Sequence, residues 1–148
     1  MLIGLPGSGK STFYRQQFAG THDHVSKDAI RNHRQPERRQ AQLLAESLGA
    51  GRSVVVDNTN PALAVRATVI AAARRHAAAV VGYFFPADAR DALRRNRTRE
   101  GRDRVPDVAI FTTRKRLELP SYAEGFDRLY VVTLDEKNRS FVVTPLIR

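Results

Sequence analysis

The sequence predicts an α/β fold in which helices flank a central, mostly parallel sheet. Short apolar runs alternate along the chain with helical stretches, a pattern typical of parallel strands joined by helices. A glycine-rich segment, residues 4–9, directly follows the first apolar run, where a tight turn between strand and helix is expected. The chain has 148 residues without an internal repeat or a linker, so we expect one domain over residues 1–148.

Six apolar segments are predicted to form strands. The third is rich in valine, as expected for a central parallel strand that is buried on both faces. The last two are predicted to pair as a hairpin around residues 135–138. The predicted strands are residues 1–3, 23–26, 53–57, 80–85, 129–134 and 141–146.

Helices are predicted between these strands, and glycine or proline marks several of their ends. Gly20 closes the first helix, Pro36 breaks the second and Gly49 ends the third. Asn60 is predicted to cap the fourth helix, with Pro61 at its first position. The predicted helices are residues 10–19, 28–34, 37–48, 61–76, 87–99 and 106–117.

The charge of the chain favours a polyanionic partner. Lys and Arg total 25 against 15 Asp and Glu, which gives a net charge of +10, and only four of these basic residues are lysine. Arginine suits bidentate contacts with phosphate, so nucleic acid is a candidate partner. A GC-rich genome that favours Arg and Ala codons is the alternative explanation of this composition.

Other features of the composition exclude whole classes of protein. Cysteine is absent, which excludes a disulfide framework and a thiolate metal site. The longest apolar runs, residues 54–56 and 77–81, are too short to span a membrane. Residues 4–12 are glycine-rich and polar where a signal peptide has an apolar segment. Since cysteine is also absent, we expect a cytoplasmic protein with no membrane partner.

Residues 4–11 read GLPGSGKS, which matches the P-loop pattern G-x-x-x-x-G-K-[ST]. In this pattern, glycines let backbone amides surround phosphates at the positive end of the following helix. The sequence therefore predicts an ATP site with Mg²⁺. Lys10 is expected to reach the β- and γ-phosphates, and Ser11 to ligate Mg²⁺. The residues predicted to bind the nucleotide are Gly7, Ser8, Gly9, Lys10, Ser11 and Thr12.

Two carboxylates follow predicted strands at the edge of the sheet where ligands bind. Asp57 ends the valine-rich strand and is predicted to hold Mg²⁺ beside Ser11, with capping of a turn as the alternative. Asp28 is predicted to be the general base that accepts the proton of an acceptor hydroxyl, with Arg31 binding a phosphate on the same helix face. A helix cap beside a solvated arginine is the alternative for this second pair.

A pair of arginines is predicted to form a lid over the phosphates. Arg95 and Arg99 are four residues apart and so share a face of the predicted helix 87–99. Phosphoryl transfer needs cations around the γ-phosphate, and a mobile helical lid provides them while excluding water. A solvated basic surface is the alternative. His22 and His24 alternate along a strand, and without a third ligand they predict no metal site.

These motifs together resemble the 5′-hydroxyl polynucleotide kinases, both the phage end-healing enzyme and the kinase domain of mammalian polynucleotide kinase-phosphatase. The resemblance runs from residue 2 to about residue 134, and DNTNP in its order relative to SKD is its most specific element. It is carried by GLPGSGKSTF at residues 4–13, SKD at 26–28, DNTNP at 57–61 with Arg66, Arg95-Asn96, and LPSYAEGF at 119–126.

The resemblance implies a P-loop kinase fold and a role for each matching residue. Asp28 matches the general base, Arg95 and Arg99 match lid arginines, and Thr59 falls in the loop lining the acceptor pocket. Arg31 matches the phage enzyme's arginine beside the acceptor phosphate, a position at which the mammalian form departs. The D-x-D-x-T signature of the phosphatase module in bifunctional relatives is absent from the sequence.

The sequence therefore predicts an enzyme that uses Mg·ATP to phosphorylate the 5′-hydroxyl end of DNA or RNA, in end healing or repair. Two other functions stay open. A small-molecule P-loop kinase would have a closed substrate pocket and no need of a net charge of +10. A P-loop regulator that binds a nucleotide without transferring phosphate would need no base at Asp28.

Overall fold

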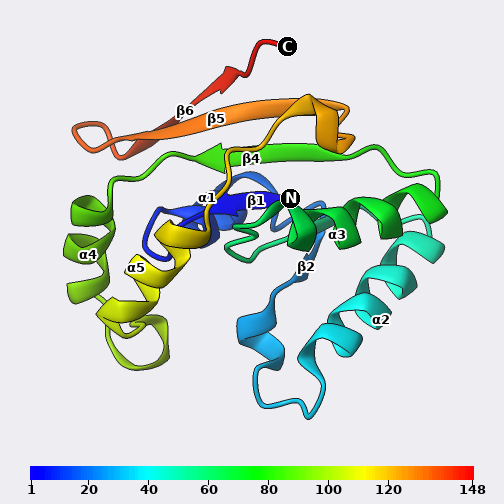
Figure 1. The fold of residues 1–148 in the computed structure, drawn as a ribbon, viewed down its shortest axis with the longest axis horizontal. Coiled ribbons are helices and arrows are strands. Elements are labelled where there is room, and N and C mark those ends of the chain that lie inside the picture. Colours follow the sequence, from blue (N-terminus) through cyan, green and yellow to red (C-terminus); the bar gives the residue numbers. More distant parts are fainter.

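The computed structural model describes residues 1–148 and has a central sheet that is parallel except at one edge (Figure 1). Its strands are β1 (Leu2–Gly4), β2 (Asp23–Val25), β3 (Val54–Val56), β4 (Val81–Phe85), β5 (Arg128–Asp135) and β6 (Ser140–Pro145). A parallel bridge between Leu2 and Asp57 joins the β2–β3 pair to β1, so the order is β2-β3-β1-β4-β5-β6. Only β6 runs antiparallel, in the predicted hairpin with β5. The predicted α/β class is confirmed.

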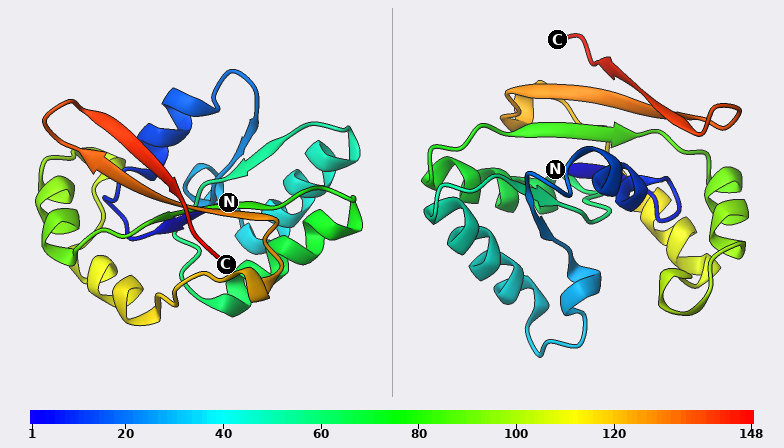
Figure 2. Two further views of the ribbon diagram at one scale, coloured as in Figure 1. Left: turned by 90° about the horizontal axis from the view of Figure 1, so that it is seen from above. Right: turned by 180° about the vertical axis from the view of Figure 1, so that it is seen from behind.

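Helices lie on both faces of this sheet (Figure 2). They are α1 (Lys10–Gln17), α2 (Pro36–Gly49), α3 (Leu63–Arg75), α4 (Ala89–Arg97) and α5 (Asp107–Arg116). Because side chains alternate along a strand, Leu2 and Phe85 pack on Phe13 of α1, whereas Ile3 packs on Ile70 of α3. α4 and α5 pack together around Leu5, at the end of β1.

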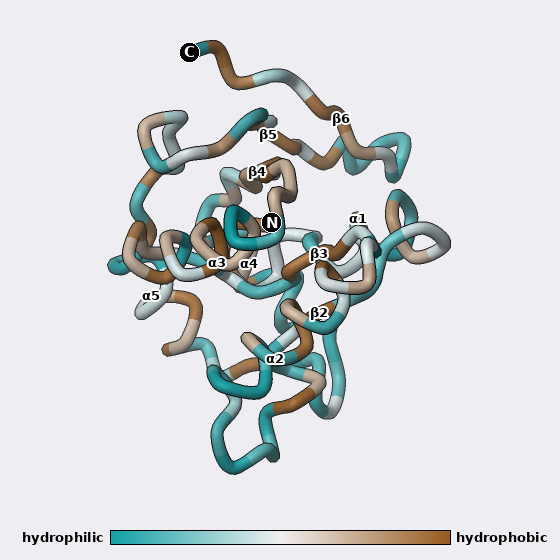
Figure 3. The backbone as a smooth tube through the Cα atoms, turned by 90° about the vertical axis from the view of Figure 1, so that its right-hand side faces the viewer, coloured by the Kyte–Doolittle hydropathy of each residue, from teal (hydrophilic) through white to brown (hydrophobic).

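Hydrophobic residues gather in the strands, and a hydrophilic turn precedes α2 (Figure 3). This turn follows the 3₁₀ helix η1 (Lys27–Ile30), which replaces the longer helix predicted over residues 28–34. Pro36 then occupies the first turn of α2, where a proline needs no amide hydrogen. None of the helices combines the length and hydropathy that crossing a membrane requires.

Two predicted helix boundaries are wrong. α3 begins at Leu63 after Ala62, so Asn60 does not cap it. Asn60 is instead buried with a φ of +44°, and its side-chain amide donates to the Leu2 carbonyl at 2.7 Å. α4 ends at Arg97, so Arg99 lies in the following loop and not on the helix face that it was predicted to share with Arg95.

A buried ion pair ties the segment after β3 to the segment before β5. The side chain of Arg66, on α3, is fully buried and forms a bidentate pair with Glu124, at 2.7 and 2.9 Å. The same guanidinium donates to the carbonyls of Asn60, Pro61 and Glu118. It thereby holds the backbone of residues 60–61, next to Thr59.

Candidate active site

The glycine-rich loop between β1 and α1 needs its glycines for two reasons. Gly7 and Gly9 have φ values of +79° and +97°, which residues with a side chain rarely adopt. A Cβ at Gly7 would also approach the Ala92 carbonyl oxygen of α4 to 2.7 Å. The loop therefore combines a left-handed backbone with close contact to the helix that carries Arg95.

The loop presents free amides at the start of α1. Within it, only the Ser8 amide is used by the protein, donating to the Leu5 carbonyl at 3.2 Å. Amides at the N-terminus of a helix have no partner within the helix and form an anion site together with its dipole. No protein atom accepts a hydrogen bond from the amides of Gly7, Gly9, Lys10, Ser11 and Thr12.

Lys10 is buried and folded back along the inside of the loop. Its Nζ donates to the carbonyls of Gly4 at 3.0 Å and Leu5 at 2.6 Å, and to Ser8 Oγ at 3.3 Å. Burial lowers the pKa of Lys10 to about 8, and the charge of Asp57 opposes this shift. The charge of Arg99 also lowers this pKa, and that of Asp28 raises it.

Asp57 meets Ser11 beside the loop, as predicted for a metal site. Ser11 Oγ donates to Asp57 Oδ2 at 2.9 Å, and the Asp57 side chain is only 3% exposed. Burial acts to raise the pKa of Asp57, but hydrogen bonds from His24 and Ser11 outweigh it and keep the pKa below its ordinary value. A hydroxyl and an ionised carboxylate are the oxygen ligands that Mg²⁺ prefers, so this pair fits the predicted ion.

A cleft of about 210 Å³ opens over these residues. Asp28 lines it and is exposed, with its amide donating to Ser26 Oγ at 3.3 Å. Thr59 lines it as well, and the Thr59 carbonyl accepts from the Gly4 amide at 3.0 Å, which fixes this loop to the end of β1. The cleft is also lined by Lys10, Ser11, Lys27, Asp57, Asn58, Arg99 and Arg102.

A second cavity, of about 390 Å³, lies on the other side of the loop. It shares Gly7, Gly9 and Arg99 with the cleft, and Thr12 and Arg95 also line it. Arg95 donates to the Gly7 carbonyl at 3.4 Å and pairs with Glu136, at the β5–β6 turn, at 3.1 Å. The structure therefore places both predicted lid arginines beside the P-loop, Arg95 from α4 and Arg99 from the loop that follows this helix.

A family model described as "AAA domain" matches residues 1–120, from β1 through α5. The chain belongs to this AAA domain family. The matched region contains every residue that the sequence predicted for the site.

Two curated relatives support the resemblance to polynucleotide kinases. A putative bifunctional polynucleotide phosphatase/kinase of Acanthamoeba polyphaga mimivirus is 32% identical over 90% of this chain. A bifunctional polynucleotide phosphatase/kinase of Schizosaccharomyces pombe is 26% identical over 85% of it. The chain spans only 32% and 31% of these two relatives, about a third of their length.

A solved structure shares the fold of this AAA domain. Kti12 of Chaetomium thermophilum, in complex with ADP-AlF3, aligns with a TM-score of 0.71 at 16% identity. The alignment covers 91% of this chain and 88% of that one. At this identity the likeness concerns the fold, and it confirms the P-loop α/β architecture.

The structure separates one predicted residue from the site and adds another. Arg31 is exposed after η1 and does not line the cleft that Asp28 lines. His24, which sequence reasoning set aside, contacts Asp57 Oδ2 through Nε2 at 2.8 Å. The alternation of side chains along β2 predicts which face His24 occupies, but the contact itself depends on the register of β2 on β3.

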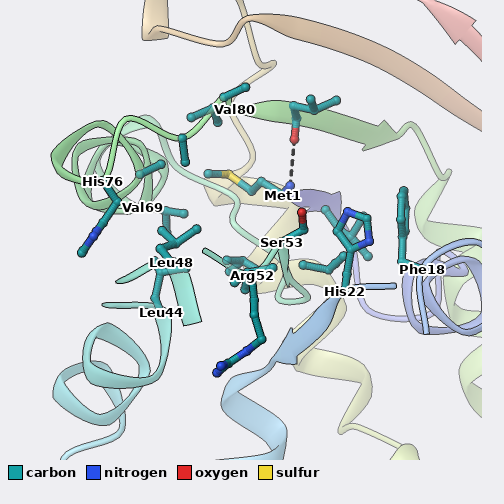
Figure 4. Close-up of a pocket in the computed structure, with 18 of the residues that line it drawn as sticks. Met1, Phe18, His22, Leu44, Leu48, Arg52, Ser53, Val69, His76 and Val80 are labelled. Carbon is teal, nitrogen blue, oxygen red and sulfur yellow. Dashed lines mark hydrogen bonds between the residues drawn. The ribbon is translucent and has the colours of Figure 1, made fainter. Parts of the chain in front are cut away.

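A larger cavity of about 480 Å³ lies at the opposite end of the strands (Figure 4). Its lining is mainly apolar and includes Met1, Leu44, Leu48, Val69 and Val80. The Met1 amine donates to the Val81 carbonyl at 2.8 Å, and burial lowers the pKa of this amine to about 5. No residue of the P-loop lines this cavity.

Proposed function

We propose that this chain transfers the γ-phosphate of ATP to the 5′-hydroxyl end of a polynucleotide. The observation that carries the proposal is the cleft in which Asp28 faces the same space as Lys10 and Arg99. A base and two cations around one space suit the transfer of a phosphoryl group to a hydroxyl. The names of the two curated relatives support a polynucleotide as the acceptor.

The P-loop side of the cleft binds and orients the donor. The free amides of residues 9–12 surround its phosphates, and Lys10 leaves its backbone contacts to pair with phosphate oxygens. Ser11 and Asp57 would hold Mg²⁺, which supplies positive charge to those oxygens. Arg99 lines both cavities, so it lies where donor and acceptor meet.

The reaction is an in-line displacement at the γ-phosphorus. The oxygen of the 5′-hydroxyl forms a bond to phosphorus as its proton passes to the Asp28 carboxylate. The bond from phosphorus to the bridging β,γ-oxygen breaks, and ADP leaves with that electron pair. Lys10, Arg95 and Arg99 stabilise the charge that spreads over the phosphoryl oxygens.

The test is transfer of label from γ-labelled ATP to oligonucleotides. We expect a 5′-hydroxyl oligonucleotide to be labelled and the same oligonucleotide with a 5′-phosphate to stay unlabelled. Asp28→Asn should bind ATP normally but nearly abolish labelling, because the amide cannot accept the proton. Lost ATP affinity with turnover retained would instead assign Asp28 to donor binding.

The same assay separates the alternative function. A nucleotide-binding regulator of this fold is compatible with the likeness to Kti12, because a likeness at 16% identity concerns the fold alone. Such a protein would bind ATP and label no acceptor, and Asp28→Asn would change nothing. The exposure of Asp28 in the cleft, beside Lys10, favours the kinase.

A further inference from the structure

His24 lies on β2, next to the carboxylate that ends β3. Its Nε2 is 2.8 Å from Asp57 Oδ2, and its side chain is 35% exposed against 3% for Asp57. Nothing in the predicted P-loop site accounts for an imidazole at this place. An ionised carboxylate can only accept a hydrogen bond, so Nε2 carries the hydrogen in this contact.

The pairing of two strands and one aromatic ring fixes this contact. His24 pairs with Val55 and Val25 with Val56, so by alternation the side chains of His24 and Asp57 lie on the same face. The ring of Tyr14, from α1, stacks on the imidazole at 4.0 Å with an interplanar angle of 12°. Tyr14 is itself held by a hydrogen bond from its hydroxyl to the His22 carbonyl, at 3.2 Å.

The two oxygens of Asp57 are used differently. Oδ2 accepts from both Ser11 Oγ, at 2.9 Å, and His24 Nε2. Oδ1 accepts a hydrogen bond from no protein atom. It is not buried, and Asp57 lines the cleft, so Oδ1 is accessible from there. Rotation of the carboxylate would break both hydrogen bonds, so these two donors keep Oδ1 available to the cleft.

We propose that His24, held by Tyr14, is a positioning residue that orients Asp57 for the divalent cation accompanying the nucleotide. Carboxylates that serve a metal are commonly held by such outer hydrogen bonds, whose loss costs about 10–100-fold in metal affinity. The inference rests on the proposed metal role of Ser11 and Asp57, and it does not depend on which molecule accepts the phosphate. A failure to phosphorylate oligonucleotides would therefore leave it intact.

Two substitutions separate the hydrogen bond from the packing. His24→Phe keeps a ring against Tyr14 but has no donor, whereas His24→Gln loses the ring but places an amide donor near Asp57. His22→Gln is the matched control, because His22 contacts Phe18 and Thr21 and not Asp57. Thermal unfolding of each protein checks that the fold is retained.

The measurement is the affinity for ATP as Mg²⁺ is titrated, with no acceptor present. Without Mg²⁺, all variants should bind ATP like the wild type. His24→Phe should need about 10–100-fold more Mg²⁺ to reach the tight complex, while His24→Gln and His22→Gln stay close to the wild type. An unchanged Mg²⁺ requirement in His24→Phe, or an equal loss in His24→Gln, would overturn the proposal. The proposal would also be overturned if the affinity of the wild type for ATP did not depend on Mg²⁺.

Discussion

Replacing Arg66 with methionine should destabilise the chain severely, because the change leaves a buried charge without its partner. The Arg66 side chain is 0% exposed and that of Glu124 only 4% exposed. Removing one member of a buried ion pair costs about 3–5 kcal/mol. For a chain of this size, that loss corresponds to a fall in Tm of roughly 6–20 °C.

The other hydrogen bonds of Arg66 increase the expected loss of stability in this variant. Arg66 makes five hydrogen bonds, two to Glu124 and three to backbone carbonyls. Methionine preserves much of the volume but leaves these acceptors without a donor. We therefore expect the free-energy loss to lie in the upper part of the range for a buried pair.

Urea unfolding of wild type, Arg66→Met and the double variant Arg66→Met/Glu124→Leu measures the effect. The double variant should lose less than the sum of the two single losses, because no unpaired charge remains buried. A loss in Arg66→Met below about 1 kcal/mol, the value typical of exposed pairs, would refute the reasoning.

The remaining predictions concern the site and one surface carboxylate. Lys10→Ala should lower kcat by about 10²–10³-fold, the cost of a lost preorganised donor; turnover like that of the wild type would remove Lys10 from the mechanism. Arg99→Ala should lower kcat more than it weakens oligonucleotide binding, because a lid arginine acts mainly in the transition state; the reverse pattern would make Arg99 a nucleic-acid contact. Asp127 accepts from the Val80 amide at 2.6 Å and from Arg74, and these bonds lower its pKa below 3.8. The ionised Asp127 carboxylate stabilises the fold above pH 3.8, and this stabilisation is lost as the pH falls through the lowered pKa of the folded state. Asp127→Asn should therefore reduce the urea midpoint of unfolding at pH 7 but not at a pH below that folded pKa. An equal difference from wild type at both pH values would contradict this assignment.

The sequence predicted the parts of the site that depend on neighbours along the chain. The P-loop motif determined the turn at Gly7 and Gly9, the start of α1 and the place of Ser11, since each depends on residues a few positions away. Apolar runs predicted the strands, so Asp57 and Asp28 were expected at the correct edge of the sheet. Their roles remain predictions.

What the sequence did not predict depends on long-range contacts. Asn60 has the residue type of a helix cap, but a hydrogen bond to Leu2, 58 positions away, holds it in a left-handed turn instead. The contact between His24 and Asp57 requires the register of β2 on β3, which no local pattern contains. α4 ends two residues before Arg99, where the buried Asn96 side chain bonds both the carbonyl and the amide of Val105, nine residues further along the chain.

The central claim is that a polynucleotide end, and not a small molecule, is the acceptor. The most direct measurement compares initial rates of label transfer to a short 5′-hydroxyl oligonucleotide and to the free nucleoside, at low and physiological salt. We predict that the oligonucleotide is used far better. The logarithm of its association constant, obtained from initial rates at several oligonucleotide concentrations, should fall by ~0.7 per log unit of salt for each phosphate contacted. Equal use of both acceptors, with no dependence on salt, would contradict the account and indicate a small-molecule kinase.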